Sequence, residues 1–297
     1  MDSLRNIAAS GITVTISPTQ LIVGAGLLGV ALVSNAKSLL FAWHGRLFAQ
    51  LARHLLLRRS QLTVTSAHHG GESLFAPVVT SSYTPLLDID YNLHKSNSTF
   101  FNDLDDNRTE LLLALFKDVV KPRQRGKGRL QAKMFNLGGT CCIFKKAIAP
   151  FSKFEISSRI LCWDEKWVYV VSHFTKPGSN SASRIVPEAS TKKQDPVADR
   201  AGCIYATAVT KYVFKQGRKT CAPESVMQEC GLLPPQPTTE ESEGRRTGIS
   251  QNSHDHWSWE QVQEECNKHL QVAQNFGSLD QLHDTFVGHS APAMYHY

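Results

Sequence analysis

The longest regular pattern in the chain is a series of apolar residues spaced three and four positions apart between Phe100 and Val119. That spacing predicts a helix with a broad apolar face. Asn97 or Ser98 is placed to cap its start, and Pro122 ends it. We therefore expect one long, largely buried helix in the middle of the protein.

Stretches in which apolar and polar residues alternate lie on both sides of this helix. They cover 76–83 before the helix and 134–147, 154–162, 167–174 and 203–215 after it. The turn Asp164-Glu165-Lys166 joins two of these strands into an antiparallel hairpin, and 223–230 forms a short closing helix. The polar, Ser- and Pro-rich stretch 176–200 is expected to be a flexible surface insertion. This order of elements predicts an α+β domain over 60–235, with a sheet wrapped on a single helix.

The N-terminal segment has a different character. No residue from Asn6 to Ala36 carries a formal charge, and the run Leu21–Val33 contains only apolar residues and glycine. With its uncharged flanks this run exceeds the ~20 residues that cross a bilayer, so we expect a membrane anchor in 1–36. Basic residues follow the run, whereas only Arg5 precedes it, which favours a single-pass protein with its main domain in the cytosol. The segment 37–59 resembles a basic amphipathic helix of the type that lies at a lipid surface.

Two other interpretations of this segment are open. A short apolar core followed by small residues is also typical of a cleaved signal peptide. The spacing of Gly24, Gly26 and Gly29 matches a dinucleotide-binding loop, but no acidic residue occurs between Asp2 and Glu72 to hold a ribose. Glycines in a membrane helix explain the spacing better.

The C-terminal segment 236–297 is acidic and rich in histidine, whereas the whole chain has a formal charge of +6. This balance gives little support for nucleic-acid binding. A marginal amphipathic helix is expected near 257–275, on what we interpret as a solvated appendage. The histidines lack the spacing of a zinc site, so no metal or cofactor is expected. The odd number of seven cysteines favours a reducing compartment.

Candidate chemistry lies in the loop before the long helix. Asp88, Asp90, His94 and Asn97 fall within ten residues, just ahead of a helix N-terminus with unpaired N–H groups. Such a helix end can stabilise an oxyanion while a carboxylate or imidazole takes a proton from water. The same residue types also serve as ordinary turn and cap residues.

A resemblance extends this interpretation. The run D-x-D-Y-N-L-H-x-x-N-S, the long helix, and the strands G-G-T-C-C-I-F-K-K and F-E-I-S-S-R-I-L-C-W-D-E-K-W-V-Y-V-V-S-H-F together resemble the hotdog-fold thioesterases over 37–235, without 176–200. The chain is most similar to the membrane-anchored thioesterase-like proteins of animals and filamentous fungi. The resemblance implies a single hotdog fold, a homodimer with acyl-CoA sites at the subunit boundary, and hydrolysis of an acyl-CoA or carrier-bound thioester. For a fungal member it also implies a polyketide or other secondary-metabolite pathway.

The resemblance also implies roles for individual residues. Asp90 matches the loop acid that activates water or attacks the thioester, and its spacing to His94 and Asn97 matches the family pattern. Leu93 and Ser96 depart from that pattern, because members commonly have glycine and asparagine there. We assign Asp88 to holding the loop. The anionic end of the substrate needs a basic lip, which is expected from Lys121, Arg123 and Arg125, or else from Lys145 and Lys146.

Two alternatives to hydrolysis follow from these departures. In the first, the chain does not turn over substrate and acts instead as a non-catalytic acyl-binding or interaction protein. In the second, it is a hotdog hydratase or dehydratase, whose D-x-N-P-h-H motif Asp90–His94 approximates without the proline. The missing proline makes this second alternative the weaker one.

Overall fold

The computed structural model describes residues 17–57, 71–121, 132–180, 202–234, 236 and 257–286. Its helices are α1 (Pro18–Ser34), η1 (Ala36–Ser38), α2 (Ala42–Leu51), η2 (Ala52–Leu56), η4 (Gly71–Leu74), η5 (Leu86–Asp88), α3 (Thr99–Val120), α5 (Pro223–Glu229), α7 (Trp259–Gly277) and η6 (Ser278–Thr285). Its strands are β1 (Val78–Tyr83), β2 (Met134–Phe144), β3 (Lys153–Trp163), β4 (Trp167–Thr175), β5 (Ile204–Gln216) and β6 (Lys219–Cys221). Parts of the predicted insertion and of the C-terminal segment lie outside the described residues.

The strands form one antiparallel sheet in the order β1-β3-β4-β5-β2, with β6 paired to β5. The predicted hairpin is confirmed as β3 and β4, which pair antiparallel. Asp164 closes its turn, because its Oδ1 accepts hydrogen bonds from the backbone N–H groups of Lys166 and Trp167 at 2.8 and 2.6 Å. The expected α+β hotdog-type fold is therefore confirmed.

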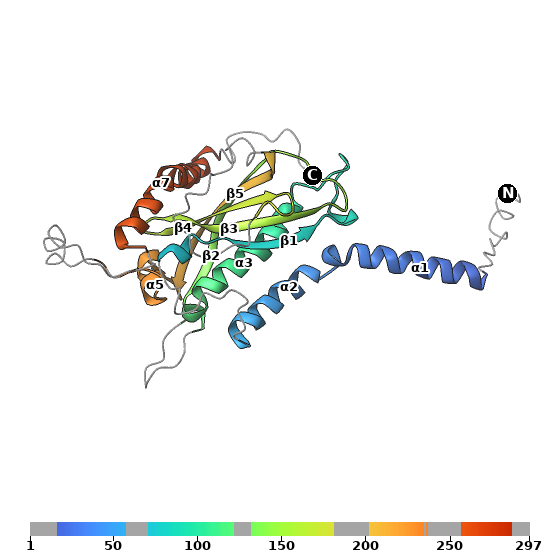
Figure 1. Ribbon diagram of the computed structural model, residues 1–297, viewed down its shortest axis with the longest axis horizontal. Coiled ribbons are helices and arrows are strands. Elements are labelled where there is room, and N and C mark those ends of the chain that lie inside the picture. The colour runs from blue at the N-terminus through green and yellow to red at the C-terminus, as the bar shows by residue number, and fades with distance from the viewer. Residues whose placement is uncertain are drawn as a thin grey trace, which may run out of the picture.

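The long helix α3 lies across one face of this sheet, as predicted (Figure 1). Two buried polar side chains attach it there. The Asn107 amide donates to the backbone carbonyls of Val78 and Ile156, and the Arg108 guanidinium donates to the hydroxyls of Thr140 and Thr210. These directional bonds fix how α3 is rotated against strands from both edges of the sheet.

The helix α7 covers part of the opposite face of the sheet. Tyr169 and Lys211 are register partners on β4 and β5. Lys211 contacts the ring of Phe276 in α7 and forms an ion pair with Asp280 of η6. Thr210, the residue next to Lys211, faces α3 instead, as its bond to Arg108 shows. A helix was predicted at 257–275, but it is not the solvated appendage that we expected.

Burial explains this correction. Val262, Cys266 and Ala273 of α7 are buried in the same apolar cluster as the second half of α3 and the sheet. They recur at four- and seven-residue steps and form a narrow apolar stripe within an otherwise polar helix. This stripe is too narrow to suggest docking from composition alone.

The N-terminal helix α1 projects away from the sheet (Figure 1), and none of its residues is buried. No helix within the described residues has both the length and the apolar character needed to cross a bilayer. The next segment is not one continuous amphipathic helix, because η1, α2 and η2 follow each other with a left-handed residue, Phe41, between the first two. Arg46 pairs with Asp106 of α3 at 2.6 Å, so this segment packs on the long helix.

Candidate active site

The loop between η5 and α3 is closed on itself by backbone hydrogen bonds. Ile89 and Lys95 form an isolated antiparallel bridge. Within it, the Asp90 N–H donates to the His94 carbonyl at 3.1 Å, and the Leu93 N–H donates to the Asp90 carbonyl at 3.0 Å. This arrangement forms a tight turn that brings the side chains of Asp90 and His94, four positions apart in the chain, close together.

Leu93 occupies the left-handed region of backbone space in this turn, with φ of 58°. That conformation is strained for an L-residue, whereas glycine adopts it freely. Leu93 is the position at which the resemblance predicts glycine, so the turn keeps a glycine conformation without the glycine. The side chain points outward and is 75% exposed.

The Asp90 carboxylate lies close to the His94 imidazole. Their Oδ1 and Nδ1 atoms are 3.6 Å apart, and both side chains are partly exposed. Asp90 Oδ1 also accepts the Asn92 N–H at 2.9 Å, which restrains the carboxylate. His94 Nδ1 lies 3.3 Å from the Lys95 carbonyl. A proton on Nδ1 would interact with either oxygen and leave Nε2 as the acceptor of the ring.

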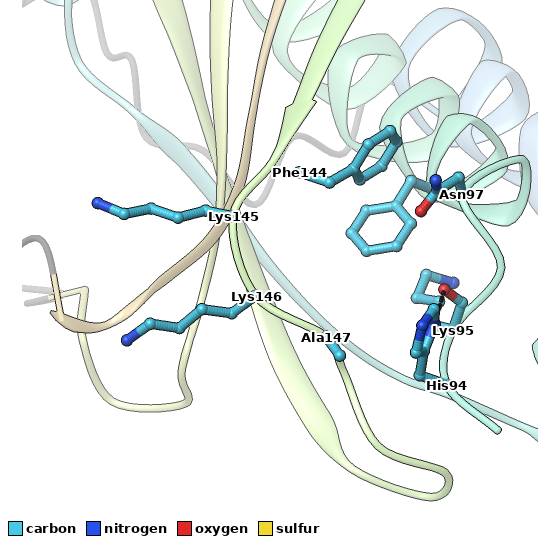
Figure 2. A pocket seen from close by; sticks show the side chains of 8 residues that line it. His94, Lys95, Asn97, Phe144, Lys145, Lys146 and Ala147 are labelled. Atoms are coloured by element: carbon cyan, nitrogen blue, oxygen red, sulfur yellow. Dashed lines mark hydrogen bonds between the residues drawn. The ribbon is translucent and has the colours of Figure 1, made fainter. Parts of the chain in front are cut away.

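A pocket of about 280 Å³ opens at the start of α3 (Figure 2). Its walls are His94, Lys95, Asn97, Phe100, Phe144, Lys145, Lys146 and Ala147. His94 and Asn97, both predicted from the sequence, therefore share one pocket. Asp90 is not part of its wall and approaches the pocket through His94.

The pocket also has an apolar part that the sequence analysis did not identify. The Phe100 and Phe144 rings meet edge to face with centroids 5.1 Å apart. Phe100 lies in the first turn of α3, where N–H groups are free of intrahelical partners. An acyl chain could lie against these rings while its carbonyl oxygen faces the positive end of the helix. Phe100 had been assigned only to the apolar face of the helix, and nothing in its spacing distinguishes it from core residues.

Buried charged side chains stabilise the loop between η5 and α3. Burial alone would raise the pKa of the Asp88 carboxyl, but the hydrogen bond from Ser38 and the charges of Lys95 and Lys37 hold the pKa below its ordinary value. The Asp88 carbonyl also accepts the Ser96 N–H at 2.7 Å. These contacts agree with the predicted role of Asp88 in holding the loop. The buried lysines were missed as site residues, because a lysine in a polar stretch ordinarily indicates surface.

Lys121, the one described member of the predicted basic lip, does not lie at this pocket within one chain. Lys121 follows the last residue of α3. A 22-residue helix at ~1.5 Å per residue separates it by roughly 33 Å from the pocket at the first turn. Arg123 and Arg125 lie outside the described residues.

The alternative pair, Lys145 and Lys146, contributes to the wall of the pocket. Figure 2 shows their side chains extending away from His94 and Asn97. Lys146 Nζ donates to the Gly202 carbonyl at 2.6 Å. In this arrangement both ammonium groups point away from the predicted catalytic residues. Across the described ranges, no group of three or more His, Cys, Asp or Glu side chains could hold a metal ion.

Comparisons with known proteins agree with this picture. Residues 84–229 match the model of the thioesterase-like superfamily. The chain is 39% identical to thioesterase poxG of Penicillium oxalicum, over 86% of its own length and 84% of the relative's. It is 40% identical to the probable thioesterase atnL of Emericella nidulans, over 90% and 89% of the two chains.

Solved structures match more distantly. The probable thioesterase YbaW of Escherichia coli matches 52% of this chain and 96% of its own at 12% identity, with a TM-score of 0.37. The length and identity of the sequence matches are enough to establish the family, and the structural match is not needed for that conclusion. The chain therefore belongs to the thioesterase-like superfamily, and it is a thioester hydrolase with a hotdog-type fold.

Proposed function

We propose that the pocket at the start of α3 hydrolyses an acyl-CoA or carrier-bound acyl thioester, with Asp90 as the acting carboxylate. The observation that carries this proposal is the meeting of His94 and Asn97 in one pocket, with Asp90 Oδ1 3.6 Å from the His94 ring. Asp90 and His94 together take a proton from water, and the water oxygen bonds to the carbonyl carbon. The C–S bond then breaks, and the proton taken from water passes from the Asp90–His94 pair to the sulfur, so that the products are a carboxylic acid and a thiol.

Other groups around the pocket bind the substrate and stabilise the transition state. The Phe100 and Phe144 rings accept the acyl chain, and the N-terminus of α3 stabilises the oxyanion. The Asn97 amide positions the thioester or the water. Asp90 lies outside the wall of the pocket, so it acts through His94, or reaches water at the mouth of the pocket.

A thiol-release assay over CoA esters of increasing chain length tests the proposal. Asp90→Asn and His94→Gln should each lower kcat/KM by about 10²-fold or more, the usual scale of general acid–base catalysis. Tyr91→Phe is a matched control, because Tyr91 lies in the same turn and is 92% exposed. Equal activity of Asp90→Asn and the native chain would remove Asp90 from the mechanism. Binding of acyl-CoA without release of any ester would favour the non-catalytic role.

We also propose that the substrate belongs to a polyketide-type secondary-metabolite pathway. Resemblance to fungal members supports this, together with high identity to thioesterases of Penicillium oxalicum and Emericella nidulans. Disrupting the gene in its own organism and profiling metabolites tests the proposal. Accumulation or loss of a polyketide would support it, and an unchanged profile under producing conditions would contradict it.

A further part of the proposal is that α1 holds the protein on a membrane, with the hotdog domain on the cytosolic side. The uncharged stretch from Asn6 to Ala36 supports this, and so does the finding that no residue of α1 is buried. Replacing Leu27 and Val30 by aspartate should release the full chain from sedimented membranes. Leu282→Asp is the matched control, because Leu282 is also an exposed leucine but lies in η6. A native chain found wholly in the soluble fraction would refute the anchor.

A homodimer is the last part of the proposal, and the resemblance alone supports it. Sedimentation velocity of the detergent-solubilised full chain measures it directly. Twice the mass of the chain is expected, and a single monomeric species at micromolar concentration would contradict it.

A further inference from the structure

The segment that links α1 to α2 inserts into the base of the active-site loop. Lys37 Nζ lies 3.3 Å from Asp88 Oδ2 and 2.7 Å from Asp103 Oδ1, and it donates to the Tyr83 carbonyl at 2.9 Å. The side chain is 10% exposed. Lys37 therefore joins the N-terminal segment, the entrance of the loop and the first turns of α3.

A second lysine completes the cluster from inside the loop. Lys95 Nζ lies 3.2 Å from Asp88 Oδ2 and 2.8 Å from Asp103 Oδ2, and its side chain is fully buried. The two ammonium groups thus bridge the same two carboxylates. If Lys37 is removed, two buried carboxylates are left to share one cation, which is an unfavourable arrangement in an interior.

Neighbouring contacts hold the inserted segment in place. The Ser38 hydroxyl donates to Asp88 Oδ1 at 2.5 Å, and the Asn35 side-chain oxygen accepts the Leu87 N–H at 2.9 Å. Arg46 donates to the Lys37 carbonyl at 2.6 Å. Each contact comes from residues 35–46 and restrains either Lys37 itself or the residues that open the loop.

Two residues, Asp88 and Lys95, connect this cluster of charged side chains to the pocket. Asp88 accepts the Ser96 N–H through its backbone and holds Lys95 through its side chain. Lys95 is itself in the wall of the pocket, and its carbonyl is the partner of His94 Nδ1 at 3.3 Å. A shift of Asp88 therefore moves both the His94 ring partner and the start of α3.

We propose that Lys37 is a positioning residue for thioester hydrolysis, so that the linker after α1 is part of the catalytic unit. The proposal rests on the function proposed above, because it assigns His94 to the reacting centre. Lys37 acts through Asp88 and Lys95 and does not itself touch the substrate. A purely structural role would lower stability and leave the turnover of folded protein unchanged.

The test uses the full chain with decanoyl-CoA as substrate. Lys37→Met should lower kcat by at least about tenfold with little change in KM, because small misplacements of reacting groups are costly. Amide hydrogen exchange at Asp90 and Leu93, whose N–H groups close the turn, should become faster. Lys37→Arg keeps the charge and should recover much of the lost kcat.

Arg53→Met is the matched control. Arg53 belongs to the same N-terminal segment and pairs with Glu110 of α3 at 3.6 Å, without contact to the loop. Its kcat and its exchange at Asp90 should stay within about twofold of the native chain, because the Arg53 side chain is 38% exposed and Glu110 keeps its hydrogen bond to His54. If Lys37→Met fails to fold, Ser38→Ala provides the milder variant, since it removes one hydrogen bond to Asp88.

The outcomes separate the two proposals. Native kcat in folded Lys37→Met and Ser38→Ala chains, or equal losses in Arg53→Met, would overturn the positioning role. Full activity of His94→Gln would instead overturn the catalytic assignment. In that case faster exchange of the loop in Lys37→Met would still be observed, without an effect on turnover.

Discussion

The two halves of α3 differ in the kind of residue that they bury. The first half buries the polar residues Asp103, Asn107, Arg108 and Glu110. The second half buries an almost continuous apolar surface from Leu111 to Phe116, which joins Val262 and Cys266 of α7 in one cluster. We call these regions the pocket end and the α7 end.

The two ends of α3 therefore make different contributions to the protein. Buried charges are directional and costly to desolvate, so they fix orientation more than they add stability. Apolar burial is non-directional and supplies most of the free energy of folding. The pocket end should therefore couple stability to turnover, whereas changes at the α7 end should affect stability alone.

The largest expected effect is that of Asp103→Asn. This change leaves Lys37 and Lys95 sharing the single carboxylate of Asp88, and the free energy of unfolding should fall by about 3–5 kcal/mol. Urea denaturation measures the loss, and kcat should fall with it. Asp118→Asn changes an exposed acid of the same helix and should stay within about 0.5 kcal/mol. Similar losses of unfolding free energy in Asp103→Asn and Asp118→Asn would show that the buried ion pairs do not distinguish the pocket end.

At the α7 end, Val262→Ala should lower the free energy of unfolding by about 2 kcal/mol while kcat stays native. Val262 packs against Gly71 so closely that a Cβ on Gly71 would lie 2.2 Å from its Cγ2. Gly71→Ala alone should therefore destabilise the protein. Combined with Val262→Ala, it should recover part of the loss, because the new methyl group fills the vacated space. Additive losses in the double variant would contradict this packing, and a fall in kcat would contradict the separation of the two ends.

Acid should loosen the pocket end before the α7 end. The hydrogen bond from His54, opposed by burial and aided by the charges of His54 and Arg53, lowers the pKa of Glu110, and the pKa of Asp88 is also lowered. A carboxyl with a lowered folded-state pKa contributes stability above its unfolded pKa and loses it as pH falls through the folded pKa. Glu110 and Asp88 should therefore both stabilise the pocket end at neutral pH and cease to do so in acid.

The pKa of Asp106 is shifted in the opposite direction, because burial raises this pKa more than Arg46 lowers it. Its protonation therefore offsets part of the loss. Hydrogen exchange below about pH 4 should still show α2 amides opening before those of α7, since both Asp88 and Glu110 then approach protonation. Simultaneous opening would show that the two ends respond to acid as one unit.

The smallest effect is expected for Leu93→Gly. Glycine adopts a φ of 58° without the steric cost of leucine, but it loses more backbone entropy on folding. We expect a net change in stability within about 1 kcal/mol in either direction, measured as a shift in Tm. Turnover should rise if the exposed leucine side chain obstructs the pocket. A fall in kcat would show instead that the leucine itself contributes to the site.

Periodicity predicted the architecture well because the elements obey simple burial rules. The strand β3 alternates along most of its length, and the apolar face of α3 extends along the helix, so local pattern and tertiary environment agree. The docking of α7 was missed, because three buried residues give too weak a stripe. The order of strands in the sheet is also not encoded in any local pattern.

The site was predicted in part. Helix-start chemistry pointed to His94 and Asn97, which the structure brings into one pocket, whereas the hydrogen-bonded turn that joins Asp90 to His94 was not predicted. Lys37 could not be assigned to the site from the sequence, because its partners lie 51 and 66 positions away (88 − 37 and 103 − 37). Long-range ion pairs of this kind depend on the tertiary fold, and a single sequence gives no signal for them.

The buried cluster under the loop contains two ammonium and two carboxylate groups, so it contributes no net charge to the pocket. Ions in solution screen exposed charges over about 8 Å at physiological strength but act far less on buried pairs. Added salt should therefore leave the loop in place while it weakens the capture of a substrate that carries phosphates. A KM that rises with ionic strength at constant kcat would then report the docking of those phosphates rather than any change in the catalytic groups.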